Sequence, residues 1–159
     1  MPADIPLSAE DCNCFVVRAA ARHVTQCYDQ FLASSGLRTT QFSILARLKR
    51  RGPLTISELA ESMVMDRTTL GRNILPLERD GLIRIEATAS DRRAKELHLT
   101  KDGEKRVEAA RKGWQAAQTR FEAVFGVKRA ADLRALLRGV VASELAAATS
   151  TGPNPSSRK

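Results

Sequence analysis

The chain has 159 residues, 43% of them hydrophobic, and its 26 Lys and Arg against 18 Asp and Glu give a formal net charge of +8. This length and composition suit one globular domain with a core, and the apolar runs are too short to cross a membrane. Because no signal peptide is visible, we expect a cytoplasmic protein, and the positive charge favours an anionic partner without identifying it.

The N-terminal part of the chain has the pattern of a long amphipathic helix. We expect residues 1–7 to be disordered and the helix to begin at Ser8, which precedes acidic residues suited to a first turn. Apolar side chains then recur every three or four residues from Cys12 to Phe31, and this spacing predicts a buried stripe. A second helix, capped by Thr39 or Thr40, is predicted to end at Gly52-Pro53.

The segment from Thr55 to Thr100 has the pattern of two short helices followed by a two-stranded ribbon. Thr55 and Glu58 stand at capping-box spacing at the start of the first helix. Asp66 is a good N-cap for the second, in which Leu70, Ile74 and Leu77 recur on one face. This order of elements is typical of a winged helix-turn-helix, so the predicted fold class is mainly α with a small β-ribbon.

The outer face of the second short helix is polar and cationic. Helical spacing puts Thr68, Arg72, Leu75 and Arg79 opposite the apolar stripe, with Arg67 and Thr69 on its flanks. Arginine can donate two hydrogen bonds to guanine, and threonine can reach a phosphate or a base edge, so this face suits a major groove. An ordinary solvated helix is the alternative, but the capped helix before it and the ribbon after it favour DNA.

The ribbon is predicted to contain a long basic loop. Its strands are expected at residues 82–86 and 96–99, and the loop between them carries Arg92, Arg93 and Lys95. A basic loop beside a groove-reading helix can place an arginine in the adjacent minor groove. A solvated, charged turn is the alternative interpretation.

The last third of the chain is predicted to form two helices. Thr100 is expected to cap a long helix with a heptad-like apolar seam that includes Trp114 and Phe121. A further helix, at about 130–148, offers more apolar surface than one small domain readily covers, which favours a homodimer. Residues 149–159 have the composition of a disordered tail.

These pieces together resemble the MarR family of bacterial transcription regulators. The resemblance rests on the order of the elements, on DRTTLGRNILPLERDGLI and on the wing sequence DRRAKELHLT, and it covers about residues 10–147. It implies a symmetric dimer that binds a palindromic operator and releases it when a small molecule or an oxidant is sensed. It also implies that Arg93 enters the minor groove, that Asp91 shapes the wing, and that Thr68, Thr69 and Arg72 lie on the recognition helix.

The same resemblance identifies candidate sensing residues. An effector pocket between the long helices and the DNA-binding lobe would be lined by Arg18, Arg22, His23 and Trp114, a set compatible with an anionic aromatic compound. Cys14 resembles the reactive cysteine of the organic-hydroperoxide-sensing branch of the family, and an inert thiol is the alternative. His23 and Cys27 stand four residues apart on the apolar stripe, so core packing is favoured over metal binding.

The sequence therefore predicts residues 35–99 as the winged helix-turn-helix lobe, with 8–34 and 100–148 as the dimerisation region. The predicted function is a repressor that binds a palindromic operator as a homodimer and is released by a small-molecule effector, with no cofactor and no metal. A peroxide-sensing repressor and a winged-helix module for protein–protein interaction are the alternatives. An enzyme is disfavoured because neither a phosphate-binding glycine loop nor a nucleophile motif is present.

Overall fold

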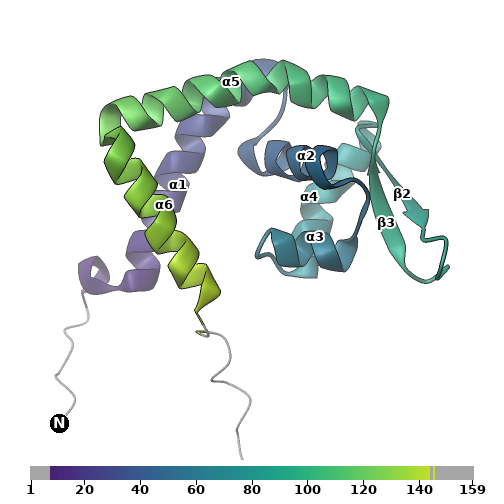
Figure 1. Cartoon of the computed structure of the whole chain (residues 1–159), viewed down its shortest axis with the longest axis horizontal. Helices are drawn as coiled ribbons and strands as arrows, with labels where there is room; N and C mark the ends of the chain where they lie inside the picture. The colour runs from purple at the N-terminus through teal and green to yellow at the C-terminus, as the bar shows by residue number, and fades with distance from the viewer. Residues whose placement is uncertain (1–7, 144, 146–159) are drawn as a thin grey trace, which may run out of the picture. The chain divides into compact units, whose positions relative to one another are not determined.

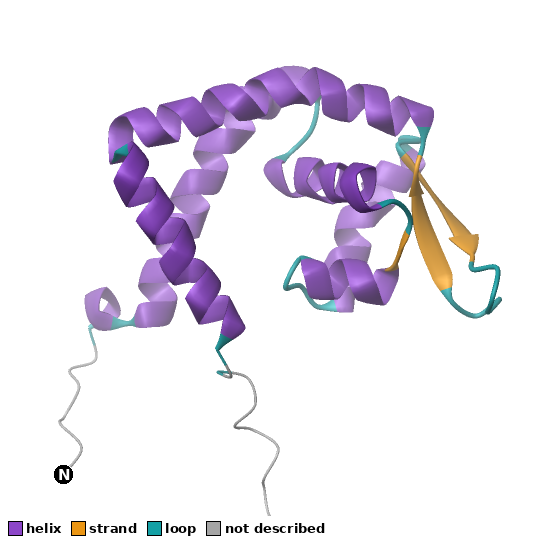
Figure 2. Cartoon of the chain, in the orientation of Figure 1, coloured by secondary structure: helices purple, strands orange, loops and turns teal. Residues whose placement is uncertain are grey.

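The computed structural model describes residues 8–143 and 145. The described residues form mainly helices and one small sheet (Figures 1 and 2), in agreement with the predicted fold class. The elements are η1 (Ala9–Asp11), α1 (Asn13–Leu32), η2 (Ala33–Ser35), α2 (Thr39–Arg51), β1 (Leu54–Thr55), α3 (Ile56–Ser62), α4 (Arg67–Arg79), β2 (Ile83–Ala87), β3 (Lys95–Leu99), α5 (Lys101–Phe125) and α6 (Val127–Ala142).

The chain divides into two compact units, Met1–Arg120 and Phe121–Lys159, where one domain was expected. The first unit contains the main core, to which α1, α2, α3, α4, α5 and the sheet contribute. Its largest fully buried side chains are Leu32, Ile44, Leu45, Leu48, Leu59, Leu70, Leu77, Ile83 and Leu97. This core fixes α4 against α2 and α3 (Figure 1). The predicted disordered segments, 1–7 and 149–159, lie outside the described residues.

The wing is a three-stranded antiparallel sheet in the order β1-β3-β2, whereas the sequence predicted two strands. The extra strand pairs Leu54 with Leu97 and Thr55 with Glu96. Two residues are too few to give the alternating pattern by which a strand is recognised in a sequence. β2 and β3 pair from Ile83 with Leu99 to Ala87 with Lys95, as the predicted ribbon requires (Figure 2).

The predicted first helix is interrupted. Ser8 caps only the single 3₁₀ turn of η1, and Cys12 then adopts an extended conformation, with φ −79° and ψ 109°, before α1 begins. Apolar spacing reports where side chains point, and it continues through Cys12 although the helical backbone does not.

The prediction that the stripe of α1 is buried is wrong for the single chain. Phe15 and Val16 are about half exposed, His23 and Cys12 are exposed, and burial is confined to Tyr28 and Leu32 near the end of the helix. Spacing identifies an apolar stripe, but it does not say which surface covers it. The N-terminal half of α1 therefore remains an uncovered apolar surface.

Two predicted helix starts also differ. Neither Thr39 nor Thr40 caps α2, because the N-cap is Arg38 and the amide of Thr39 donates to the Asp29 carboxylate, 2.7 Å away on α1. The local contact at this start is the Arg38 amide donating to the Gln41 side chain (3.0 Å), which has no Ser, Thr, Asp or Asn at the N-cap to mark it in the sequence. In the second unit, α6 starts at Val127, three residues before the predicted start, because Gly126 turns the chain with φ 97°.

The start of α5 lies against the base of the wing. Thr100 Oγ1 accepts from the amide of Gly103 (3.0 Å), as the predicted cap requires, and donates to the carbonyl oxygen of Gly81 (2.7 Å). The amide of Thr100 also donates to the carbonyl oxygen of Leu82. A Cβ on Gly103 would lie 2.1 Å from that Leu82 oxygen, so only glycine permits this approach.

Candidate nucleic-acid interface

The N-terminus of α4 is closed by a strong local cap. Asp66 accepts hydrogen bonds from the Thr69 hydroxyl (2.6 Å) and from the Thr69 amide (2.8 Å). These two bonds hold the pKa of the Asp66 carboxyl below its usual value. The cap fixes the direction in which α4 leaves the turn. It also engages the Thr69 hydroxyl as the donor of a hydrogen bond within the protein.

The two faces of α4 divide as the periodicity predicts. Leu70, Ile74 and Leu77 are buried, whereas the outer stripe, formed by Thr68, Arg72, Leu75 and Arg79, is exposed. Arg79 pairs with Asp80 at 3.1 Å. Among the described residues, the ion pairs include neither Arg67 nor Arg72, so their guanidinium groups are not neutralised by a neighbouring carboxylate.

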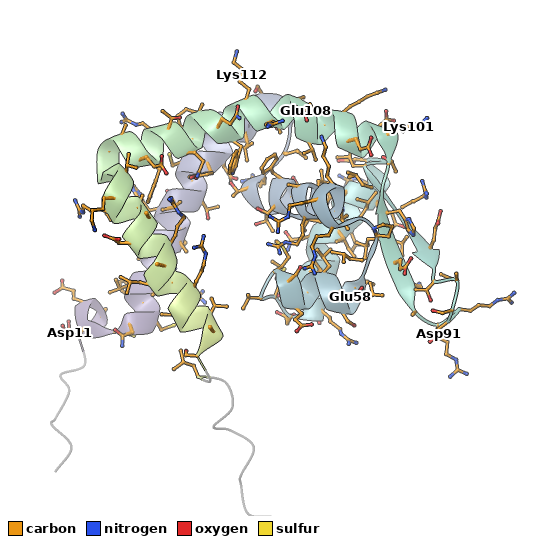
Figure 3. All side chains as sticks on the ribbon, viewed as in Figure 1. Asp11, Glu58, Asp91, Lys101, Glu108 and Lys112 are labelled. Atoms are coloured by element: carbon orange, nitrogen blue, oxygen red, sulfur yellow. The ribbon has the colours of Figure 1, made fainter. Side chains whose placement is uncertain are left out.

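The wing loop is ordered by a small hydrogen-bond network around Thr88 and Asp91. The Thr88 hydroxyl donates to the Asp91 carbonyl oxygen (2.8 Å) and accepts from the Asp91 amide (3.0 Å). The Asp91 carboxylate accepts from the amide of Arg93 (2.8 Å), and the Thr88 amide donates to Ala94. Figure 3 shows Asp91 at the tip of the hairpin, and these bonds hold the backbone from which Arg92 and Arg93 project.

A cleft of about 470 Å³ separates the start of α4 from the wing. It brings Arg67 of α4 together with Arg93 and Lys95 of the wing, so that three cations face one carboxylate, that of Asp91. Ser57 and Thr55 of the α3 start complete the polar lining. Neither was predicted from the sequence as a lining residue, although the Thr55–Glu58 capping box, which the structure contains, fixes where they lie. Such a cleft suits an anionic ligand that lies across both elements.

Comparison with known proteins identifies this arrangement. A family model described as the MarR family matches residues 37–95, which span α2, the helix-turn-helix and the first part of the wing. The crystal structure of the M. tuberculosis transcriptional regulator MosR in complex with DNA is 38% identical, with a TM-score of 0.73 over 85% of this chain and 100% of that chain.

The chain belongs to the MarR family.

Two curated relatives come from Bacillus subtilis (strain 168). The organic hydroperoxide resistance transcriptional regulator is 28% identical over 97 residues, which cover 61% of this chain and 66% of that protein. The HTH-type transcriptional repressor MdtR is 31% identical over 90 residues, 57% of this chain and 58% of that protein. These alignments span less than two thirds of either relative. The resemblance to the MarR family and the winged helix-turn-helix predicted from the sequence are confirmed.

This MarR chain gathers some of its predicted DNA-contact residues and separates others. Arg67, Arg93 and Lys95 share the cleft, whereas Thr68 lies on the exposed outer stripe and Arg92 is exposed on the wing loop. Arg72 lines a different, smaller hollow of about 190 Å³, together with Asp29 and Arg38 from the junction of α1 and α2. Their roles toward DNA stay predictions.

A third hollow, of about 470 Å³, lies between α2 and α5. Its apolar wall is built by the stacked rings of Phe42 and Trp114, with centroids 6.2 Å apart, and by neighbouring small side chains. At its rim Glu108 binds Lys49 (2.8 Å) and Arg111 (3.4 Å), and the hydrogen bond and charge of Lys49 lower the pKa of the Glu108 carboxyl. Arg50 completes this cationic rim.

Only one of the four candidate effector residues lines this hollow. Trp114 does so, whereas Arg18, Arg22 and His23 are exposed on α1 and line none of the three hollows described above.

The three cysteines differ in exposure: Cys12 and Cys14 are exposed and Cys27 is half-buried. Within residues 8–143 and 145, no group of three or more His, Cys, Asp or Glu side chains is arranged to hold a metal ion. In the same part of the chain, no helix is long and apolar enough to span a membrane.

Proposed function

We propose that this MarR-family chain is a repressor that binds an inverted-repeat operator in double-stranded DNA as a homodimer and leaves it when an effector binds. The observation that carries the proposal is the cationic cleft between α4 and the wing, where Arg67, Arg93 and Lys95 meet. The phosphate backbone of a duplex follows such a cleft when a helix enters the major groove and a wing reaches the neighbouring minor groove. The names of the relatives, a DNA-bound regulator and a repressor, support it.

Within the proposed complex the predicted residues have separate tasks. Arg67 and Lys95 neutralise phosphates at the edges of the cleft, while Thr68 and Arg72, on the exposed stripe of α4, meet base edges. Arg93 enters the minor groove from the tip of the wing, with Arg92 beside it. The Thr69 hydroxyl donates its hydrogen bond to Asp66. Toward DNA, Thr69 therefore offers an oxygen acceptor and a methyl group.

Uncovered apolar surfaces support the homodimer. In the first unit, Phe15, Val16 and Val17 of α1 are each close to half exposed. In the second unit, Leu136, Leu137, Val140 and Val141 of α6 are exposed by 40 to 70%. A soluble monomer rarely leaves so much contiguous apolar surface in water, and a second copy of the chain covers it most economically.

The DNA proposal is tested by removing one arginine from the helix and one from the wing. Arg72→Ala with Arg93→Ala is expected to weaken binding to a selected duplex by about thirtyfold or more, because each good arginine contact contributes roughly 1–3 kcal/mol. The matched control, Lys105→Ala with Lys112→Ala, removes the same charge from the exposed face of α5 and should change affinity little. Equal affinities of the wild type and the double arginine variant at moderate salt would favour the protein–protein interaction module instead.

The hollow between α2 and α5 is the proposed effector site. A flat aromatic ring fits against Trp114 and Phe42, and an anionic group on that ring would compete with Glu108 for Lys49 and Arg111. Both an apolar wall and a small number of placed charges are typical of small-molecule sites. An aromatic carboxylate therefore satisfies the hollow better than a neutral or cationic compound. Arg18, Arg22 and His23 remain candidate contacts from α1.

Peroxide sensing by Cys14 is a second candidate for the release step. Cys14 is exposed, and one curated relative is named for organic hydroperoxide resistance. In this mechanism the thiolate attacks the hydroxyl oxygen of the hydroperoxide and the O–O bond breaks, which oxidises the sulfur to a sulfenic acid. The departing alkoxide takes a proton from water and leaves as an alcohol. The new polar group would then disturb the apolar face beside Phe15.

One comparison separates the two release mechanisms. Titration with benzoate should change the fluorescence of Trp114, the single tryptophan of the chain, and should release DNA equally from wild type and Cys14→Ser. Cumene hydroperoxide should release DNA from the wild type alone if Cys14 is the switch. A fluorescence signal that does not respond to benzoate would contradict the effector site, and an equal peroxide response of both proteins would contradict the cysteine mechanism.

A further inference from the structure

Leu75 is a large apolar residue on the polar face of α4. Its side chain is 62% exposed, although the buried face of the same helix is already complete with Leu70, Ile74 and Leu77. Three and seven residues before it stand Arg72 and Thr68, so all three project from one stripe of the helix. The stripe that is proposed to meet base edges therefore contains an aliphatic side chain.

Leu75 differs in its setting from most other exposed apolar residues. Those of α1 and α6 form groups of neighbours, as expected for a surface that another protein surface covers. Leu75 instead stands between Arg72 and Arg79, both exposed. A protein partner at this position would have to cover these arginines as well. DNA offers phosphates and base acceptors to the arginines and, at one kind of base pair, an apolar group that an aliphatic side chain can contact.

The apolar feature of a base edge in the major groove is the 5-methyl group of thymine. Three helical residues rise about 4.5 Å, and consecutive base pairs of one strand are about 3.4 Å apart. A side chain three residues beyond Arg72 therefore reaches about one base pair further along the groove. The distance along the helix and the chemistry of the side chain both fit a thymine next to the base pair that Arg72 contacts.

We infer that Leu75 is a specificity-determining residue that recognises thymine through its 5-methyl group, one base pair from the contact of Arg72. This inference rests on the proposed DNA-binding function. Burying one methyl group against a leucine gives a preference of about fourfold for thymine over uracil, which has the same hydrogen-bonding groups and lacks only the methyl.

The test replaces thymine by deoxyuridine in the tightest-binding duplex recovered from a randomised library. Thymines of each half-site are replaced singly, and affinities are measured at one fixed salt concentration for wild type, Leu75→Ala and Leu75→Met. At one position per half-site, the wild type is expected to lose about fourfold in affinity for each methyl removed, and Leu75→Met should behave in the same way. Leu75→Ala should bind the thymine and deoxyuridine duplexes equally.

The controls separate this inference from general DNA binding. Glu78→Ala, an exposed change on the same helix outside the stripe, should keep the full thymine preference, and unchanged thermal unfolding of Leu75→Ala would show that the fold is intact. If Leu75→Ala retains the preference, or if the wild type shows none at any position, the role of Leu75 is overturned while DNA binding stands. If the wild type recovers no preferred duplex from the library, the proposed function itself fails.

Discussion

Val64, in the turn between α3 and α4, has a backbone conformation that its side chain disfavours. Its φ is +52°, the single positive value among the described residues other than glycine, and its side chain is 71% exposed. The turn is held by hydrogen bonds from the Val64 amide to Glu61 and from the Met65 amide to Ala60. A β-branched residue in this region is strained, and exposure means that packing does not compensate for the strain.

Val64→Gly is therefore expected to stabilise the protein. Relief of the left-handed strain contributes roughly 1–2 kcal/mol, and the greater flexibility of glycine in the unfolded chain removes about 0.5–1 kcal/mol of it. We expect a net gain in the free energy of unfolding of about 0.5–1 kcal/mol by denaturant titration. Val64→Ala, which keeps a Cβ at the strained position, should gain less. A glycine variant less stable than the wild type would show that the valine side chain makes a contact that outweighs the strain.

At the residue scale, local motifs were predictable and distant ones were not. The caps at Thr55 and Asp66 follow from residues three positions apart, and both are present. The Thr39 amide at the start of α2 is bonded by Asp29, ten residues earlier. Thr88, which orders the wing, was not recognised, because it bonds the backbone of Asp91 inside a loop where no helix start was predicted. Val64 was missed because a turn that needs a left-handed residue is usually marked by glycine or asparagine.

At the scale of elements, the start of α5 is joined to the wing through a close approach of two backbones. Gly103 lies against the carbonyl oxygen of Leu82, and an added Cβ would also lie 2.7 Å from Leu99. Thr100 closes the same junction by bonding to Gly81 and Leu82. The start of α5 is therefore packed directly against the base of β2 and β3, which carry the wing loop.

Gly103→Ala is expected to destabilise the protein by about 1–3 kcal/mol, because the backbone of Leu82 must move to admit the methyl group. Gly71→Ala is the matched control, since a Cβ there has no atom within 4 Å and alanine is the better helix former. It should leave stability unchanged or raise it by roughly 0.5–1 kcal/mol. Thermal unfolding of the two variants checks both expectations, and equal melting temperatures would contradict the packing role of Gly103.

The order of the elements was largely predictable because it depends on periodicity. The stripe Leu70, Ile74, Leu77 and the alternation around Leu97 are visible in the sequence, and they position α4 and the wing. β1 was missed because it has two residues and is formed by pairing with β3, more than 40 positions away in the chain. The residues that line the cleft were predicted only in part. Ser57 belongs to the lining because of the way α3 packs, and no sequence pattern marks it.

At the scale of the whole molecule, the single chain leaves two apolar faces uncovered. The sequence predicted that α1 is buried, and the structure exposes Phe15 and Val16, which belong to such a face. In the second unit, Leu136 and Val140 of α6 are exposed in the same way. Periodicity correctly found both stripes, but a single sequence cannot show whether the covering surface belongs to the same chain or to another copy. The proposed homodimer would account for both faces at once.

The proposed dimer also sets the geometry of the operator. In that dimer a twofold axis would relate two copies of α4, and each copy of the helix would meet one half of an inverted repeat about one helical turn from the other. The cationic cleft beside each helix then lies on the phosphate backbone of the same half-site.

The most direct test is sedimentation of the purified chain, free and bound to three duplexes of equal length that carry the selected inverted repeat, one half of it, or a scrambled sequence. We expect the free chain to sediment as a dimer, one dimer to bind the inverted repeat, and the scrambled duplex to bind at least a thousandfold more weakly at physiological salt, as roughly expected for a specific regulator. A monomeric chain, or equal affinity for the inverted repeat and the scrambled duplex, would contradict the account.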